Sequence, residues 1–507
     1  MKVVKSLLLG TAAGLIAVGG AQAADLPVKA KAVEYVKICS LYGAGFYYIP
    51  GSDTCIKLGG YLRAEVALNA GGNYSAQYNG VFAANNRLTN YYSMRAREDL
   101  NIDTRTATEY GVVRTYFDAV FTWTTGSYVG TGSATGATGY SATTAGSSTI
   151  NPTDGGISGG SLGVYYAFIQ FAGFTMGKSV SQFDAPWINY PGNNFDQLVG
   201  GSGSTNGVAQ FTYTADFGQG VSATISAQDQ TQFFTTNIWN TAGMSTTGVL
   251  GGAYGSNDIG GTRSPDIVGV VRVDQAWGLF QASVAAHDNH VGYYGATEVT
   301  GHPEDKWGWA VQLALSIKNI PTGAGDVINV SGVYTEGASR YNFQSLAATS
   351  YSMFGSSNAA YQSIGFAGVS DAVFGPGGNL ELTKTYGFRG AYTHNWSPYW
   401  NTALYGAWAA VNHSGTAKGL ICGSAAFATL TGTCNPDFNI GQVGVITRWT
   451  PVKNLTFSAD FTYSHLDQKY SGVITTGALT SVAKPAATYE LKDQDTYSLL
   501  LRAQRNW

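Results

Sequence analysis

Alternating polar and apolar residues recur in about sixteen short segments between Ile56 and the end of the chain. Successive side chains of a β-strand point to opposite faces of a sheet, so this period of two predicts strands. The segment lengths suit strands tilted across a bilayer, which need about ten residues each. The segments are 56–68, 91–104, 108–123, 160–171, 173–180, 207–217, 219–230, 265–276, 278–288, 306–318, 325–336, 382–395, 398–411, 438–449, 453–467 and 494–507.

The connections between these segments are alternately long and short. The long ones are rich in Gly, Ser, Thr and Asn, and short turns such as Ala172-Gly173 separate them. Long loops on one side and short turns on the other are typical of a transmembrane antiparallel up-and-down β-barrel, whereas a soluble sandwich has no reason to sort its loops by side. We therefore predict an all-β chain: a barrel over 56–507, with short periplasmic turns and long extracellular loops, and a periplasmic-side segment over 24–55.

The first residues are typical of a secretory signal peptide. Lys2 and Lys5 precede an apolar run over 7–18, and Ala21-Gln22-Ala23 supplies the small residues of a cleavage site. We predict a signal peptide over 1–23 that exports the chain. The apolar run is short for a spanning helix, and no later run reaches that length, so a chain like this enters a membrane only as strands.

The composition also suits a membrane barrel. Charged residues make up 12% of the chain, about half their usual share in soluble domains, and aromatic residues make up 13%. A soluble protein of this length covers its surface with Lys and Glu. Acidic residues outnumber basic ones, 31 to 28, which argues against nucleic acid as a partner.

The two faces of the predicted strands differ in polarity. In 455–463 the apolar residues share one face and the polar residues share the other, and the final strand, 497–507, shows the same pattern and ends on an aromatic residue. Aromatic residues gather at strand ends, as in interfacial girdles. Since sixteen strands enclose more space than side chains can fill, we expect the apolar face outside and a wet, polar lumen inside.

Basic residues lie on the polar face of the first three predicted strands. They are Arg63, Arg95, Arg97 and Arg114, and Arg272 and Arg389 could extend the group. The up-and-down course predicts the first four at about the same height on adjacent strands. Like charges at that distance repel in a packed core but are tolerated in a water-filled lumen. We interpret them as a basic wall of a pore constriction, the alternative being ordinary ion pairs with Glu65 and Asp99.

The third long connection, 181–206, carries many aromatic residues together with Asp184 and Asp196. A loop of this composition is expected to pack against other parts of the protein. If it folds into the barrel, the two acids oppose the arginines across a narrow gap and bias the passage of ions and dipolar solutes. An external loop with surface acids is the alternative.

Four cysteines form two pairs that are close in sequence, Cys39 with Cys55 and Cys422 with Cys434. In an exported chain such pairs favour disulfides, each contributing about 3 kcal/mol in the chain-entropy model. Metal binding is the weaker alternative because the spacing is wide and no histidine is close.

No catalytic motif is found in the sequence, and nothing in it calls for a cofactor. His287, His290 and His302 lie near acidic residues, and we interpret them as solvent-exposed polar residues rather than as a metal site. A barrel lipase would need a Ser or His on the lipid-facing side. His394 falls on that side of its strand, without an evident partner.

Three segments near the N-terminus and two others are informative together: Tyr35-Val36-Lys37-Ile38-Cys39, 42–51, 55–63, the strand 91–103, and Arg502-Ala503-Gln504-Arg505-Asn506-Trp507. In these segments the chain resembles the general porins of alphaproteobacteria. The resemblance covers essentially the whole mature chain. It implies a homotrimer of sixteen-stranded barrels in the outer membrane, each with its own pore narrowed by the third loop. Trp507 stands where a terminal Phe is commoner in that family.

These features favour a passive outer-membrane channel for ions and small hydrophilic solutes, surrounded by outer-membrane lipids. A substrate-specific channel would differ by saturable flux. A surface adhesin or structural barrel would have a plugged lumen, and a barrel enzyme would act on a substrate such as a lipid ester.

Overall fold

The computed structural model describes residues 37–69, 91–124, 127–129, 139–141, 161–231, 234–255, 257–258, 260–480 and 483–507. The predicted signal peptide, 1–23, lies outside the described residues. Within them, no helix is both long and apolar enough to cross a membrane.

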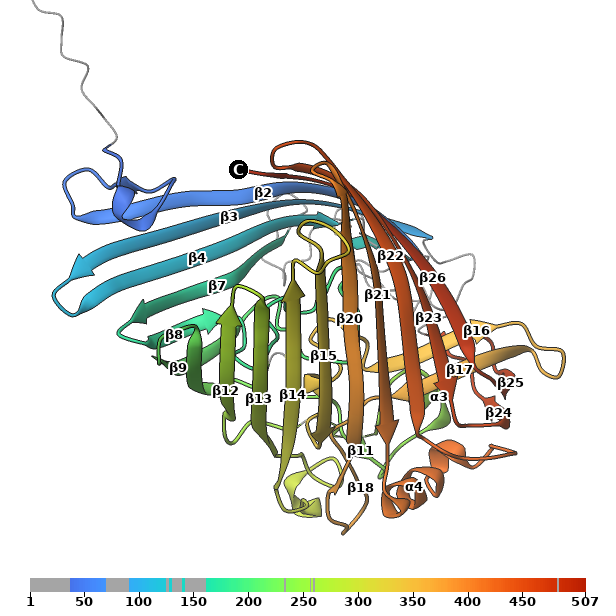
Figure 1. Ribbon diagram of the computed structural model, residues 1–507. Coiled ribbons are helices and arrows are strands. Elements are labelled where there is room, and N and C mark those ends of the chain that lie inside the picture. The colour runs from blue at the N-terminus through green and yellow to red at the C-terminus, as the bar shows by residue number, and fades with distance from the viewer. Residues whose placement is uncertain are drawn as a thin grey trace, which may run out of the picture.

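One large antiparallel sheet closes on itself as a barrel (Figure 1). Its wall strands run in chain order around the barrel, and β2 pairs with both β3 and β26, which closes the ring. They are β2 (Thr54–Leu68), β3 (Tyr92–Thr108), β4 (Gly111–Thr124), β7 (Ser161–Phe171), β8 (Phe174–Ser179), β9 (Val208–Asp216), β10 (Val221–Gln228), β12 (Asp266–Gln275), β13 (Gly278–Asn289), β14 (Lys306–Lys318), β15 (Val327–Glu336), β20 (Lys384–Ser397), β21 (Trp400–Asn412), β22 (Phe438–Val452), β23 (Leu455–Gln468) and β26 (Gln494–Asn506). Each coincides with one of the predicted segments, so the predicted barrel is confirmed.

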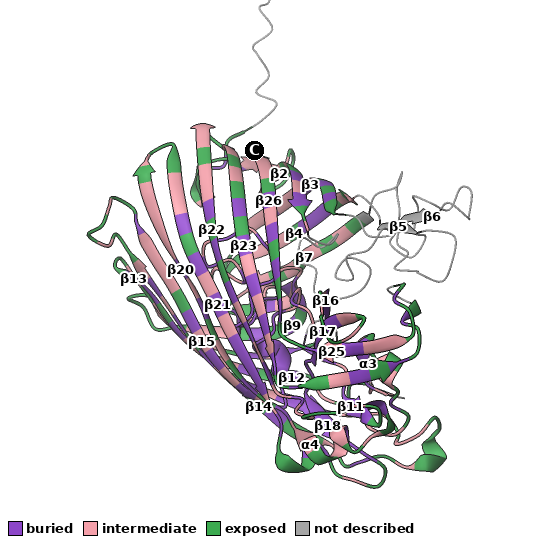
Figure 2. Ribbon diagram, turned by 90° about the vertical axis from the view of Figure 1, so that its right-hand side faces the viewer, coloured by how far each residue is buried: buried purple, intermediate pink, exposed green. Residues whose placement is uncertain are grey.

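The apolar face of the wall points outward. On β14, Trp309 and Leu313 are 45% and 54% exposed, whereas Ala310 and Gln312 on the opposite face are 1% exposed. Figure 2 shows this alternation as bands of buried and exposed residues along β20 to β23. The large exposed apolar residues therefore form the surface that a bilayer would cover.

The N-terminal part of the described chain is fastened to the start of the barrel. The short strand β1 (Tyr47–Tyr48) pairs with β2, and the 3-10 helix η1 (Ser40–Tyr42) precedes it. A disulfide joins Cys39 to Cys55, and a second joins Cys422 to Cys434. Both predicted disulfides are confirmed.

The long connections carry small elements of their own. A separate sheet has the strand order β16 (Ser350–Gly355), β17 (Gln362–Gly368), β25 (Ala487–Leu491), β24 (Gly472–Thr476). Two short helices, α3 (Thr246–Leu250) and α4 (Gly415–Cys422), pack with it around an aromatic cluster that includes Trp239, Phe366 and Tyr470. A third sheet consists of β11 (Trp239–Asn240), β18 (Ala372–Phe374) and β19 (Glu381–Leu382). These elements lie at the end of the barrel opposite to the C-terminus (Figure 1).

Candidate functional site inside the barrel

The connection between β8 and β9, residues 181–206, lies inside the barrel, and we call it the inner loop. Gln312 of β14, Asn329 of β15 and Arg448 of β22 donate side-chain hydrogen bonds to its carbonyl oxygens at 2.9, 2.8 and 2.6 Å. These wall strands are neighbours or near neighbours around the ring. The inner loop therefore follows the inward face of this side of the wall.

A second connection holds the inner loop from the long-loop side. Residues 337–383, between β15 and β20, include the 3-10 helix η4 (Ser339–Tyr341). Just after it, the carbonyl oxygen of Asn342 accepts hydrogen bonds from the backbone N–H groups of Gly200 and Gly201, at 2.9 and 3.2 Å. The ring of Tyr341 packs against Phe183 with centroids 4.5 Å apart. The inner loop is thus clamped between the wall and this second connection.

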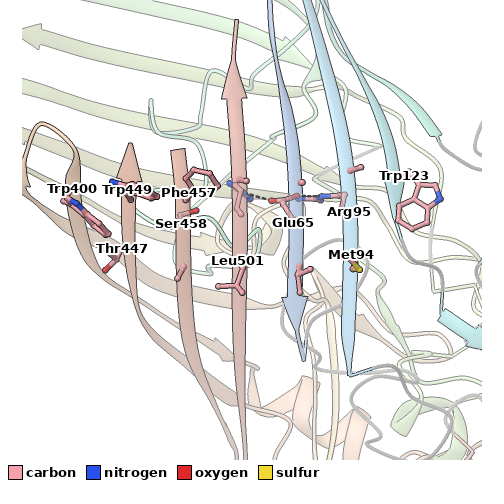
Figure 3. Close-up of a pocket in the computed structure, with 16 residues that line it drawn as sticks. Glu65, Met94, Arg95, Trp123, Trp400, Thr447, Trp449, Phe457, Ser458 and Leu501 are labelled. Carbon is pink, nitrogen blue, oxygen red and sulfur yellow. Dashed lines mark hydrogen bonds and ion pairs between the residues drawn. The ribbon is translucent and has the colours of Figure 1, made fainter. Parts of the chain in front are cut away.

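Three of the predicted wall arginines lie together on β2 and β3. Arg63 faces Arg97 in the strand register, and Arg95 faces Glu65. Arg95 donates Nε to Glu65 Oε2 at 2.6 Å, and Figure 3 shows these two side chains pointing toward each other. Arg502 of β26 donates to the other oxygen of the same carboxylate. One buried carboxylate therefore joins two guanidinium groups across the strands that close the barrel.

Arg63 and Arg97 are differently placed. Both are partly exposed, and in the described part of the chain neither forms an ion pair. Arg63 donates to Gln504 Oε1 at 2.8 Å, and Arg97 donates to Thr122 Oγ1 at 3.1 Å. Charged side chains that line a wet passage without a paired countercharge bias the ions that enter it.

Asp196 of the inner loop lies beside this arginine group. Its Oδ2 is 3.9 Å from Nη1 of Arg95, and the hydroxyl of Tyr190 donates to its Oδ1. Gln344 of the second connection donates Nε2 to the backbone oxygen of Asp196 at 2.6 Å. The structure thus brings Asp196 and Arg95 close together.

Asp184 does not face the arginines on β2 and β3, which corrects the expectation for this residue. Its carboxylate is buried and accepts hydrogen bonds from the hydroxyls of Ser202 and Ser204 and from Ser204 N, at 2.6, 2.7 and 2.7 Å. Burial raises the pKa of Asp184, although these donors and the charge of Arg389 oppose the rise. The aspartate ties the two ends of the inner loop together, because the serines return to it at the far end of the loop.

Arg114 lies away from the arginines on β2 and β3, so the prediction that it lies at the same height in the barrel is wrong. The turn at 109–110 pairs Arg114 with Arg105, whereas Arg97 pairs with Thr122. The offset of eight residues along β3 amounts to about 27 Å. Arg114 donates to Asp103 and Gln170 near the short-turn end. The height was misjudged because β3 continues to Thr108, four residues beyond the predicted end.

The two further arginines also differ from the wall group. Arg389 is 1% exposed and donates to the backbone oxygens of Ile188 and Ser202, so it supports the inner loop from the wall. Arg272 lies 3.9 Å from Asp274, close to the short turn between β12 and β13.

Sequence reasoning missed several inward residues. The sequence pattern places Arg502 on the polar face of the last strand. Its contact with Glu65 arises only because β26 pairs with β2 and closes the barrel. Asp460 of β23 accepts a hydrogen bond from Asn194 N of the inner loop at 2.6 Å. Asp118 of β4, 5% exposed, lies beside Asn101. The signal for all three was a charge on the polar face of a strand.

The histidines form no metal centre in the described ranges, where no group of three or more His, Cys, Asp or Glu side chains could hold an ion. His287 is buried, contrary to expectation, with Nδ1 2.9 Å from Asp266 Oδ1. His394 has a partner after all, since its Nδ1 lies 2.7 Å from Asp326 Oδ2. This histidine therefore braces the short turn between β14 and β15.

A hollow of about 710 Å³ lies against the outer face of the wall, beside the seam between β2 and β26 (Figure 3). Small residues such as Ala64 and Ala503 form part of its lining, and Met94, Trp449 and Leu501 form another part. These large side chains are 40–46% exposed. The hollow is therefore an apolar depression on the lipid-facing side of the barrel.

Comparisons with known proteins agree with this architecture. The family model described as "Porin subfamily" matches residues 25–500. Porin Omp2a of Brucella melitensis is 34% identical over 304 residues, which cover 59% of this chain and 70% of that protein. Porin Omp2b of Brucella suis is 31% identical over 308 residues, covering 59% and 69%.

Among solved structures, the outer membrane channel DcaP of Acinetobacter baumannii is similar with a TM-score of 0.53. The alignment covers 91% of this chain and 99% of that chain at 15% sequence identity. At this identity the likeness concerns the fold alone.

Proposed function

This chain belongs to the porin subfamily, and we propose that it forms a water-filled channel in the bacterial outer membrane for passive diffusion of ions and small hydrophilic solutes. No chemical step is involved. A barrel of this strand number is too wide for wall side chains to fill, so the lumen holds water and the inner loop sets its width. Outer-membrane lipids cover the apolar outer face.

The observation that carries this proposal is the fixed position of the inner loop beside unpaired basic residues. Hydrogen bonds from several wall strands and from residues 337–383 hold the loop in the lumen. Arg63 and Arg97 point into the same space without a paired carboxylate among the described residues. A structural barrel or an adhesin has no need for such an arrangement.

We assign the pore constriction to Arg63, Arg95 and Arg97 on the wall and to Asp196 on the inner loop. Arg95 is neutralised locally by Glu65 and Asp196. Arg63 and Arg97 therefore supply most of the field that a permeating ion meets. In this assignment Arg114 acts near the short-turn mouth, and Asp184 acts only through the shape of the inner loop.

Single-channel recording in a planar bilayer tests the channel. We expect stepwise, ohmic currents from the purified, folded protein. A silent bilayer, with folding verified by heat-modifiable migration on a gel, would refute the channel and favour an adhesin or a structural barrel. Hydrolysis of a lipid ester by the detergent-solubilised protein would instead indicate an enzyme.

We further propose that the channel is a homotrimer. The apolar depression beside the β2–β26 seam offers a lipid-facing surface that a neighbouring barrel can cover. Native mass spectrometry in detergent should give three chains per particle, and current steps should close in threes. A monodisperse monomer that still conducts would overturn the trimer but not the channel.

A further inference from the structure

Four aromatic side chains line one wall of the lumen, on β4 and β7. They are Tyr116, Tyr165, Tyr166 and Phe168, and we call them the aromatic track. Tyr116 faces Phe168 in the strand register, with ring centroids 5.4 Å apart and planes inclined by 27°. Tyr116 and Tyr166 have centroids 6.4 Å apart. All four side chains are partly exposed.

The track departs from the rule for wet barrels, whose inward side chains are polar. Phe168 has no polar atom to offer water, yet it alternates with the outward Ala167 and Ile169 and so points inward. The ring stacks on Tyr116 and lies 5.5 Å from the guanidinium carbon of Arg114, yet the side chain stays partly exposed, and apolar surface that remains in contact with water is unfavourable.

A β-bulge increases the number of rings on this wall. Asp118 pairs with Tyr166 and Ala119 with Val164, so Tyr165 is an extra residue in β7. Its ring lies beside Arg97, 5.8 Å from the guanidinium carbon to the ring centroid, and thus on the lumen side as well. Bulges re-aim side chains and are common beside functional sites.

Two glycines lie directly beside the track. A Cβ atom at Gly163 would lie 3.1 Å from the ring of Tyr165, so the ring occupies the space that a side chain there would take. Gly177 of β8 faces Phe168 in the register. The wall next to these two rings therefore carries no bulky neighbour at these positions.

Hydrogen-bonding groups flank the rings. Asn101 Oδ1 accepts a hydrogen bond from the hydroxyl of Tyr116 at 2.6 Å, and Arg114 donates a hydrogen bond to Gln170 Oε1 at 2.8 Å. Asp103 is paired with Arg105 and Arg114, so this part of the wall offers both donors and acceptors with paired charges. Hydroxyl groups, which donate and accept, suit such a surface better than a charged solute does.

We propose that the aromatic track is a binding path for neutral saccharides crossing the lumen. Sugar rings present C–H faces that stack on aromatic rings, while their hydroxyls bond to groups such as Asn101 and Gln170. From Tyr165 to Phe168 the path is about 10 Å long, which is enough for more than one sugar ring. The inference rests on the proposed open channel and deepens it by naming a solute class.

The test is a titration of the ion current through the reconstituted full-length protein with maltotriose. We expect saturable block by maltotriose, and only a linear, viscosity-like decrease with poly(ethylene glycol) of similar mass. Phe168→Leu should raise the half-blocking concentration at least fivefold and leave the sugar-free conductance nearly unchanged. Phe117→Leu is the matched control, because this residue is the neighbour of Tyr116 on the outward face and is 37% exposed.

The outcomes separate the inference from the channel itself. Current without saturable block, or equal block in the wild type and in Phe168→Leu, overturns the saccharide path and leaves the channel standing. A folded protein without current overturns the channel. Should Phe168→Leu fail to fold, Tyr165→Ala serves in its place, with the same expected rise in half-blocking concentration.

Discussion

Replacing Arg97 by Gln should shift the ion selectivity of the channel toward cations. An ion that passes the inner loop at about 5 Å from this guanidinium interacts with it by about 0.8 kcal/mol in water. Screening at 0.1 M salt reduces this to about 0.5 kcal/mol. Because the charge attracts anions and repels cations by this amount, its loss changes the free-energy difference between the two ions by about 1 kcal/mol. With RT at about 0.6 kcal/mol, the cation-to-anion permeability ratio should rise about fivefold.

Arg114→Gln provides the comparison, since it removes the same charge at the other end of β3. Arg97 lies on β3 two residues from Arg95, which is 3.9 Å from Asp196 of the inner loop, whereas Arg114 bonds to Asp103 and Gln170 near the short-turn end. We therefore expect ions that pass the inner loop to stay farther from Arg114 than from Arg97. At about 10 Å the screened interaction is about 0.15 kcal/mol, and the ratio should change less than twofold.

The assay is the reversal potential in a tenfold KCl gradient across a planar bilayer. Arg97→Lys keeps the charge and should behave nearly as the wild type does. An equal shift for Arg97→Gln and Arg114→Gln would refute the reasoning, because it would mean that the ions do not pass closer to Arg97.

Four further predictions concern stability and the inner loop. Glu65→Gln leaves Arg95 and Arg502 without their shared carboxylate and should destabilise the barrel by about 3–5 kcal/mol, seen as a lower unfolding temperature in detergent than for the wild type. Gln344→Ala removes the hydrogen bond to Asp196 O and should increase the open-channel current noise; wild-type noise would show that this contact does not hold the inner loop. Replacing Cys422 and Cys434 by Ser should weaken loop 413–437 by about 3 kcal/mol and speed its proteolysis without altering conductance. Burial tends to raise the pKa of Asp437, but hydrogen bonds from His413 and Lys418 outweigh it and hold the pKa below its usual value. The stabilisation that the ionised carboxylate gives to the loop is present above the unfolded-state pKa and is lost as the pH falls through the folded-state pKa. Pepsin should therefore cleave the loop faster below about pH 4 in the wild type, with little such change in Asp437→Asn.

The barrel could be predicted from the sequence because its signals are local. Each wall strand carries its own period of two, and each turn carries its own breaker residues, so the strands were found with ends shifted by a few residues. Both disulfides were predictable for the same reason, since the cysteines of each pair are 16 and 12 residues apart.

The candidate site was predicted only in part because it depends on heights and long-range contacts. The four-residue extension of β3 moved Arg114 away from Arg97, since a turn displaces both of the strands it joins. Asp184 carries a charge that any wall arginine could attract, and nothing local indicates that Ser202 and Ser204 return to it. The packing of residues 337–383 on the inner loop has no sequence signal of this kind.

The contacts of the inner loop also bear on how the ring of strands is held closed. Arg502 of the last strand donates to Asn194 O, 308 residues earlier in the chain, and also reaches Glu65 of the first wall strand. The seam between β2 and β26 brings together the most distant parts of the sequence, which makes its formation entropically expensive and slow. Since the inner loop contacts Arg502 of β26 on one side of that seam and Arg95 of β3 on the other, it links the two ends of the sheet from inside the barrel.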